Sequence, residues 1–124
     1  MIQLDTHVVV WLFAGSVERL SQSAARLIDL HELLVSPMVE LELQYLFEVG
    51  RTTLPAGDVL TAMRRRIGLR RVDIPFAEVI SETERMSWTR DPFDRLIAAT
   101  AVATDTRLLT ADETIRKNCD LAVW

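Results

Sequence analysis

Short apolar runs alternate along this chain with longer segments of helical character, and this alternation limits its fold more than any other feature. Runs suited to strands occur at residues 2–4, 32–36, 69–74, 107–110 and 121–123. Strands separated by helices pair in parallel, and the helices cover both faces of the sheet. The sequence therefore predicts an α/β domain with a central, mostly parallel sheet of about four to five strands.

The predicted helices begin and end at recognisable signals. The first follows Asp5 and ends near residue 14, where Gly15 terminates it. The second begins at Ser21 or Ser23 and ends at residue 30, and the third is capped by Ser36. Further helices are expected over residues 55–67, 76–86 and 92–104, with a short one that ends near residue 118.

Length and composition set the class of protein. With 124 residues, of which 49% are hydrophobic, the chain is long enough for one core, so residues 1–124 are expected to form one domain. The apolar runs are far shorter than a membrane span, and no signal segment opens the chain, which predicts a cytoplasmic protein without a membrane anchor. Cys119 is the only cysteine and the chain has two histidines, which excludes an internal disulfide and leaves little for zinc.

The segment at residues 90–99, Arg-Asp-Pro-Phe-Asp-Arg-Leu-Ile-Ala-Ala, brings two carboxylates into the first turn of a predicted helix. Asp91 stands at the N-cap position, Pro92 at the first helical position and Asp94 three residues after the cap. At about 100° per residue, Asp94 lies on the apolar face of this helix. A carboxylate there requires a cation or a hydrogen-bond donor, because burying it alone costs several kcal/mol. Asp91 is either a helix cap or a further ligand.

A second informative acid lies on the helix that follows Ser36. On a helical wheel Glu42 falls within a narrow stripe formed by Met38, Tyr45 and Val49, whereas Glu40 falls roughly opposite. We therefore expect Glu42 to face the core and Glu40 to face solvent. The alternative for Glu42 is a buried acid paired to one of the arginines.

Four acids are expected to converge at one edge of the sheet. Asp5 and Asp112 stand at the carboxyl ends of predicted strands, where ligands bind in parallel sheets, and Glu42 and Asp94 point inward from helices. Clustered like charges raise one another's pKa unless a cation neutralises them. With oxygen ligands only, the fitting cations are Mg²⁺ or Mn²⁺, which bind phosphodiesters and activate water.

The basic and aromatic residues leave two interpretations open. Arg64, Arg65 and the basic residues after them complement a helix C-terminus, or they form a patch that faces phosphates. A net charge of -4 argues against nucleic-acid binding through the overall field, but not through a metal and a local patch. The tryptophans at positions 11, 88 and 124 are expected in the core, although an exposed Trp88 would contact a substrate or partner.

Four segments of the chain resemble the signature blocks of the PIN-domain ribonucleases, in particular the VapC toxins of type II toxin-antitoxin pairs. The blocks are Leu4-Asp5-Thr6-His7, Ser36-Pro37 followed by Glu42, residues 90–98, and residues 108–113 (Leu-Leu-Thr-Ala-Asp-Glu). They occur in the family's order and span the whole chain. The resemblance implies a three-layer α/β/α domain and a Mg²⁺- or Mn²⁺-dependent endoribonuclease. It also implies a homodimer that a cognate antitoxin holds inactive.

The resemblance also implies roles for individual residues. The family's four acids fall on Asp5, Glu42, Asp94 and Asp112, with Asp91 as a further acid near the cluster. Thr6 and Thr110 match polar positions that would hydrogen-bond the carboxylates or a bound water. Arg64, Arg65, Arg90 and Arg95 are candidate RNA contacts.

Two positions depart from the pattern of the family. Thr89 stands where many relatives carry histidine, and Leu41 stands where many carry tryptophan. Neither change removes a candidate metal ligand, so the departures bear on substrate preference rather than on activity.

Three other functions remain as alternatives. A receiver domain would require two adjacent acids after the first strand and a lysine near the last, but Thr6 follows Asp5 and the only lysine is Lys117. A haloacid-dehalogenase-like phosphatase would require Asp-x-Asp at the first strand, where position 7 is histidine. The third is a non-catalytic module that binds a partner, which would gain nothing from clustered like charges.

Overall fold

A five-stranded parallel sheet organises the computed structural model, which describes all of residues 1–124. The strand order is β3-β2-β1-β4-β5, and every neighbouring pair is parallel. The prediction of a parallel α/β sheet is confirmed. The strands are β1 (Ile2–Leu4), β2 (Leu33–Val35), β3 (Arg70–Arg71), β4 (Arg107–Leu109) and β5 (Ala122–Val123).

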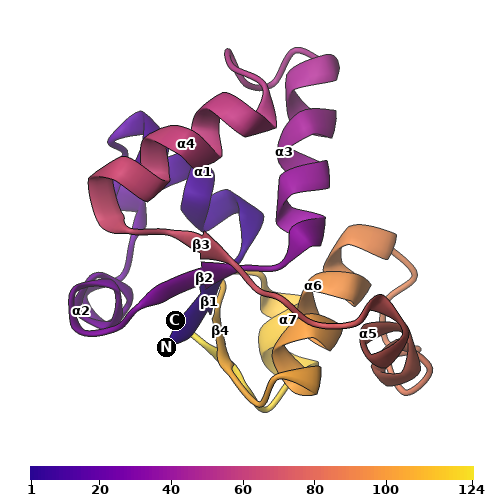
Figure 1. Cartoon of the computed structure of the whole chain (residues 1–124). Helices are drawn as coiled ribbons and strands as arrows, with labels where there is room; N and C mark the ends of the chain where they lie inside the picture. Colours follow the sequence, from indigo (N-terminus) through magenta and orange to yellow (C-terminus); the bar gives the residue numbers. More distant parts are fainter.

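The helices form a layer on each side of this sheet (Figure 1). In Figure 1, α1 and α4 lie above the sheet with α3 beside them, and α5, α6 and α7 lie below it. A 3-10 turn at Val17–Arg19 follows α1. The helices are α1 (Thr6–Ala14), α2 (Gln22–Leu30), α3 (Pro37–Glu48), α4 (Ala56–Ile67), α5 (Phe76–Thr83), α6 (Pro92–Ala103) and α7 (Glu113–Asn118).

The strand order reverses at β1, which is the middle strand. From β1 the chain moves outward to β2 and β3, and it then crosses the sheet to place β4 on the other side of β1. Leu4 pairs with Leu109, and the Asp5 amide donates to the Leu109 carbonyl at 3.0 Å. Asp5 and Thr110 therefore stand side by side at the carboxyl ends of β1 and β4, where open parallel sheets bind ligands.

The core is the sheet together with the inner faces of the helices. Ile2, Leu4 and Val35 from the strands, and Ile97 and Ala101 from α6, are completely buried. They belong to one cluster of 19 buried residues, which fixes the strand ends and hence the positions of the side chains beyond them. No helix is both long enough and apolar enough to cross a membrane.

The predicted inward stripe of α3 is wrong. Val39, Leu43 and Leu46 form the buried face, whereas Tyr45 and Val49 remain 47% and 49% exposed. The buried face is turned by roughly 90° from the predicted one, because α3 packs against α1 and α4 as well as α6. Glu42 lies between the two faces and is half-buried, and Glu40 is half-buried rather than in solvent.

Most predicted boundaries agree with the structure, and the exceptions are β3, which spans Arg70–Arg71 instead of residues 69–74, and α5. Glycine at position 15 ends α1 with a φ of 73°, and Ser21 and Ser36 cap α2 and α3. The helix α5 ends at Thr83 instead of residue 86, and the guanidinium of Arg95 donates two hydrogen bonds to the Thr83 carbonyl, at 3.0 and 2.9 Å. A distant arginine thus satisfies a carbonyl at the helix end, which no local signal in α5 encodes.

Candidate active site

Asp5 is held at the end of β1 by hydrogen bonds to both carboxylate oxygens. The Thr6 amide donates to Oδ1 at 2.7 Å, and the Thr110 hydroxyl donates to Oδ2 at 2.6 Å. The residue is 4% exposed. Its position is therefore fixed both by the start of α1 and by the end of β4.

Thr110 also links Asp5 to Asp112. Its hydroxyl oxygen accepts a hydrogen bond from the Asp112 amide at 3.1 Å. Asp112 then caps α7, accepting from the Ile115 amide at 2.8 Å. The predicted supporting role of Thr110 thus has a geometric basis, since one buried hydroxyl positions the loop that carries a second acid.

Asp91 and Asp94 differ in how their carboxylates are bound. Asp91 caps α6, and its Oδ1 accepts from the amides of Phe93 and Asp94 at 2.8 and 3.1 Å. The half-buried carboxylate of Asp94 accepts no hydrogen bond and forms no ion pair. Of the two acids, Asp94 is therefore the one whose two carboxylate oxygens are both free for a ligand.

Electrostatics shows that the acids act on one another. Burial, reinforced by the negative charges of Asp91, Asp5, Asp112 and Glu42, raises the pKa of Asp94 to about 7. Each of the other four acids thus lies near enough to disfavour the ionised form of Asp94. The predicted convergence is present in this electrostatic sense.

Burial also raises the pKa of Asp5 and of Glu42. For Asp5, hydrogen bonds from Thr110 and the Thr6 amide and the charge of His7 act against that rise. For Glu42, the Thr6 hydroxyl and His7 act against it, while the charges of Asp5 and Asp91 add to it. The net pKa shift is upward at both positions, so the protein disfavours the ionised form of both carboxylates.

The Thr6 hydroxyl is buried and makes no hydrogen bond of standard geometry. It faces the Glu42 carboxylate closely enough to counteract part of the rise in that group's pKa. A buried hydroxyl without a partner is uncommon and costs about 1–3 kcal/mol. At this position it is a donor and acceptor available to a ligand or water within the cluster.

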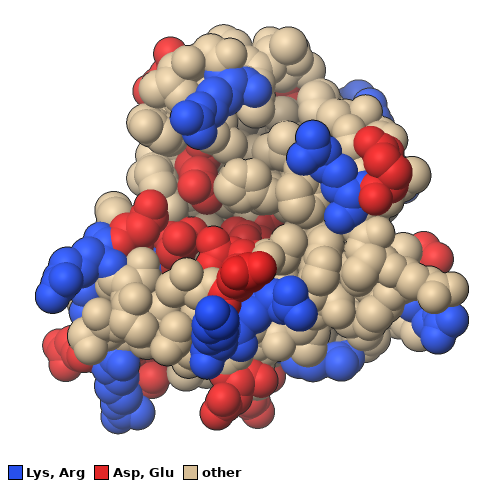
Figure 2. Space-filling view, turned by 180° about the vertical axis from the view of Figure 1, so that it is seen from behind, with Lys and Arg blue, Asp and Glu red and all other residues tan.

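No lysine or arginine forms an ion pair with the acids of the cluster. The three ion pairs of the structure join Arg70 to Glu32, Arg71 to Glu40, and Arg85 to Glu82. The alternative in which Glu42 pairs with an arginine is therefore wrong. Figure 2 shows a face of the molecule where acidic side chains gather in a hollow, with basic side chains around it.

The chemistry of the cluster fits a hard divalent cation. Its donors are all oxygens, the carboxylate of Asp94 is free, and the Thr6 hydroxyl lacks a partner. However, no three His, Cys, Asp or Glu side chains are gathered closely enough to hold an ion as they stand. Side chains would have to move inward when a cation binds.

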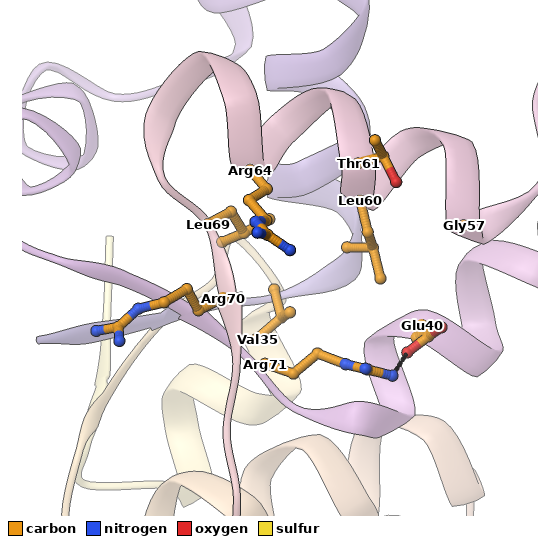
Figure 3. Close-up of a pocket in the computed structure, with 9 residues that line it drawn as sticks. All are labelled: Val35, Glu40, Gly57, Leu60, Thr61, Arg64, Leu69, Arg70 and Arg71. Carbon is orange, nitrogen blue, oxygen red and sulfur yellow. Dashed lines mark hydrogen bonds and ion pairs between the residues drawn. The ribbon is translucent and has the colours of Figure 1, made fainter.

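Two of the four candidate RNA-contacting arginines are engaged away from the acids. Arg95 binds the Thr83 carbonyl, and Arg64 lines a cavity of about 550 Å³ against α4, together with Arg70 and Arg71 (Figure 3). None of the four acids lines this cavity, which also contains the Arg71–Glu40 pair (Figure 3). Arg65 and Arg90 are exposed on the surface.

An aromatic group beside the acids was not predicted. The rings of His7 and Trp11 lie 6.1 Å apart, and those of Trp11 and Trp124 lie 5.9 Å apart. All three tryptophans of the chain are half-buried, and Trp88 packs against both apolar clusters. The spacing of His7 and Trp11, one helical turn apart, was the only sequence signal for this group.

Solved structures of toxin-antitoxin complexes share this fold. The VapBC2 complex of Rickettsia felis was solved bound to a DNA fragment from the promoter of the VapBC2 pair. One of its chains superposes with a TM-score of 0.67 at 21% identity. The match covers 99% of this chain and 96% of that one. A chain of a toxin-antitoxin complex from Klebsiella pneumoniae gives a TM-score of 0.65 at 14% identity, over 100% and 97% of the two chains.

Sequence comparison identifies the family. The chain is 32% identical to Ribonuclease VapC22 of Mycobacterium tuberculosis (strain ATCC 25618 / H37Rv) over 119 residues, which is 94% of this chain and 91% of the relative. Residues 2–121 match the PIN domain family. The receiver and dehalogenase alternatives are therefore set aside. The chain belongs to the PIN-domain family.

Proposed function

We propose that the chain is a Mg²⁺- or Mn²⁺-dependent endoribonuclease that acts as the toxin of a toxin-antitoxin pair. The observation that carries this proposal is a cluster of acids with raised pKa values and no cationic partner, at the carboxyl ends of β1 and β4. The similarity to a VapC ribonuclease supports RNA as the substrate. A divalent cation bound here would neutralise the phosphodiester and activate water for hydrolysis.

The proposal assigns a role to each acid of the cluster and to the two threonines beside them. Asp5, Glu42, Asp94 and Asp112 hold the metal and form the catalytic group, and Asp94, with a pKa raised to about 7, must lose its proton to bind the metal. Asp91 caps α6 and sets the direction from which Asp94 enters the cluster. Thr110 positions Asp5 and Asp112, and the Thr6 hydroxyl is available to orient a carboxylate or a water.

The partners follow from the same assignment. A cognate antitoxin would neutralise the nuclease, as supported by the toxin-antitoxin complexes that share the fold. The expected homodimer is supported by apolar side chains exposed on α3 and α5, among them Leu41, Tyr45 and Phe76. We further propose that residues 1–124 act as one domain, since one sheet spans the chain, and that the protein acts in the cytoplasm.

Cleavage of a mixed single-stranded RNA by antitoxin-free protein tests the function. The reaction is run with Mn²⁺, Mg²⁺ or EDTA, with wild type beside Asp94→Asn. The matched control is Asp58→Asn, because Asp58 is an exposed acid in the first turn of α4 just as Asp94 lies in the first turn of α6.

We expect cleavage that requires the metal, is lost in Asp94→Asn and persists in Asp58→Asn. Cleavage by wild type in EDTA would contradict the metal dependence. Absence of cleavage in a protein that binds Mn²⁺ would favour the partner-binding module, and full activity of Asp94→Asn would remove Asp94 from the site.

A further inference from the structure

A strip of aromatic and basic side chains runs along α1 beside the acid cluster. His7 and Trp11 lie one turn apart on this helix, with ring centroids 6.1 Å apart and planes tilted by 47°. Trp124 meets Trp11 edge to face at 5.9 Å, and the Arg19 guanidinium lies over the Trp11 ring at 5.8 Å from its centroid. We call these four residues the aromatic strip.

Within the strip, Trp11 is less closely tied to the core than Trp124 is. Trp11 packs against neither of the two buried apolar clusters, whereas Trp124 packs against the larger cluster and Trp88 packs against both. His7 and Arg19 are exposed, and Trp11 and Trp124 are half-buried. The arrangement of Trp11 is therefore not explained by a contribution to the core, although a tryptophan left at the surface keeps a large apolar area in water.

The strip begins at the acid cluster. His7 is the second residue after Asp5, and its charge lies near enough to Asp5 and Glu42 to act against the rise in their pKa caused by burial. Trp11 follows one turn further along the same helix. A chain of nucleotides with one phosphate at the acids would thus meet the ring of His7 and then that of Trp11.

We propose that the aromatic strip stacks an unpaired base of single-stranded RNA next to the phosphate that is cleaved. This inference rests on the proposed function and extends it to how the substrate is held. Proteins read single-stranded RNA chiefly by stacking its bases on aromatic rings, with basic side chains that neutralise the phosphates. The strip offers both features, and the acids themselves offer neither.

The Arg19 side chain has two possible contacts in this arrangement, the Trp11 ring and an RNA phosphate. At an exposed site its contact with Trp11 is weak, so a base can displace the guanidinium from the ring. The freed side chain then pairs with the phosphate that follows the stacked base. A protein segment from an antitoxin would also cover the rings, but it would gain nothing from His7 and Arg19 unless it were acidic.

Removing single bases from a labelled RNA tests the inference. Fluorescence anisotropy measures binding to protein that carries Asp94→Asn, so that the RNA stays intact. We expect Trp11→Leu in this background to weaken binding about 10-fold, and Trp11→Phe, which can still stack, to weaken it less. Phe13→Leu is the control, because Phe13 is a half-buried aromatic on the same helix with its own arginine, Arg66, over the ring.

The position of the missing base makes the test specific. An abasic nucleotide at one position should weaken binding about 10-fold, and that penalty should vanish in Trp11→Leu. A change in fold would instead weaken binding of every RNA in the series and lower the melting temperature.

Three results would overturn the inference. The first is unchanged RNA binding by Trp11→Leu while the wild-type protein still cleaves RNA, which leaves the nuclease proposal intact. The second is unchanged RNA binding with a weakened antitoxin complex, which assigns the strip to a protein partner. The third is a wild-type protein that neither binds nor cleaves RNA, which also removes the proposed function.

Discussion

The acid cluster and the arginine-lined cavity beside β3 handle charge in opposite ways. In the cavity Arg71 Nη1 meets Glu40 Oε2 at 2.7 Å, and nearby Arg70 lies 3.4 Å from Glu32, so carboxylates within the protein balance these two guanidinium groups. In the cluster Asp94 and four neighbouring acids share a partly buried space without an ion pair to any lysine or arginine. The comparison separates charges that the fold has already satisfied from charges that it leaves for a ligand.

The helix α3 carries one acid of each kind. Glu40 is bound to Arg71, while Glu42, two residues later, has a pKa raised by burial. The helical wheel places the two glutamates on different faces, but it does not predict that Glu40 pairs with Arg71. The two differ in their neighbours, since Glu40 contacts Arg71 whereas Glu42 lies near Asp5.

The largest expected effect compares these two glutamates directly. Glu42→Gln should lower metal-dependent RNA cleavage by about 100-fold or more, the order of loss seen when one charge-stabilising group is removed. Glu40→Gln should leave the rate within about twofold, a difference that multiple-turnover rates at saturating Mn²⁺ would measure. Equal losses in the two variants would break the comparison, because the ion-paired acid would then belong to the site.

A smaller effect concerns stability without metal. The folded protein retains the Asp94 proton up to a pKa of about 7, whereas the unfolded chain releases it near the ordinary value of 3.8. The stability that the folded protein gains by holding this proton is therefore fully present below pH 3.8, declines as the pH rises and is lost above pH 7. Asp94→Asn should raise the melting temperature in EDTA at pH 8 by about 4 °C, allowing for a side chain that is roughly half exposed.

The same variant should show a smaller gain at pH 5, where Asp94 is neutral in the folded protein but already ionised in the unfolded chain, and no gain below pH 3.8. Mn²⁺ should raise the wild-type melting temperature more at pH 8 than at pH 6, because binding must displace the proton. Asp58→Asn should be slightly destabilising at both pH values, since an exposed acid in a first helical turn favours the helix. Calorimetry that found Asp94→Asn less stable than wild type at pH 8 would contradict the view of an uncompensated cluster.

The smallest expected effect belongs to the arginine-lined cavity. Arg71→Gln breaks an ion pair whose side chains are 62% and 35% exposed, so it should cost no more than about 1 kcal/mol. The loss should shrink further in 1 M salt, and RNA cleavage should be unchanged. Urea unfolding at low and high salt measures the difference, and a loss of several kcal/mol would mean that the pair stabilises the fold as a buried one does.

The parts of the fold that the sequence predicts best depend on local signals. Asp91 and Pro92 mark the start of α6, and apolar strands that end in Asp5 or lead to Asp112 mark the sheet edge. Alternation of strands and helices was enough to predict a parallel sheet. Within the candidate site, the convergence of the acids was predicted, and the roles of its residues remain proposals.

The parts that it missed depend on contacts between distant residues. The inward face of α3 is chosen by three neighbouring helices, so a helical wheel placed it roughly 90° away. The hydrogen bonds from Arg95 to the Thr83 carbonyl were not predicted, and neither was the contact of Trp11 with Trp124. Such pairings depend on the packed structure, and one sequence carries no periodicity that encodes them.

The strand order has a consequence for synthesis of the protein. Among the five strands the middle strand β1 comes first in the sequence, but its neighbour β4 spans Arg107–Leu109, so one side of β1 stays unpaired until β4 has left the ribosome. The hydrogen bond from Thr110 to Asp5 closes over a separation of 105 residues. Because such long-range pairing must wait for its partner, the nascent chain carries its acids apart. The acid cluster therefore cannot form until the segment that carries Asp112 has left the ribosome.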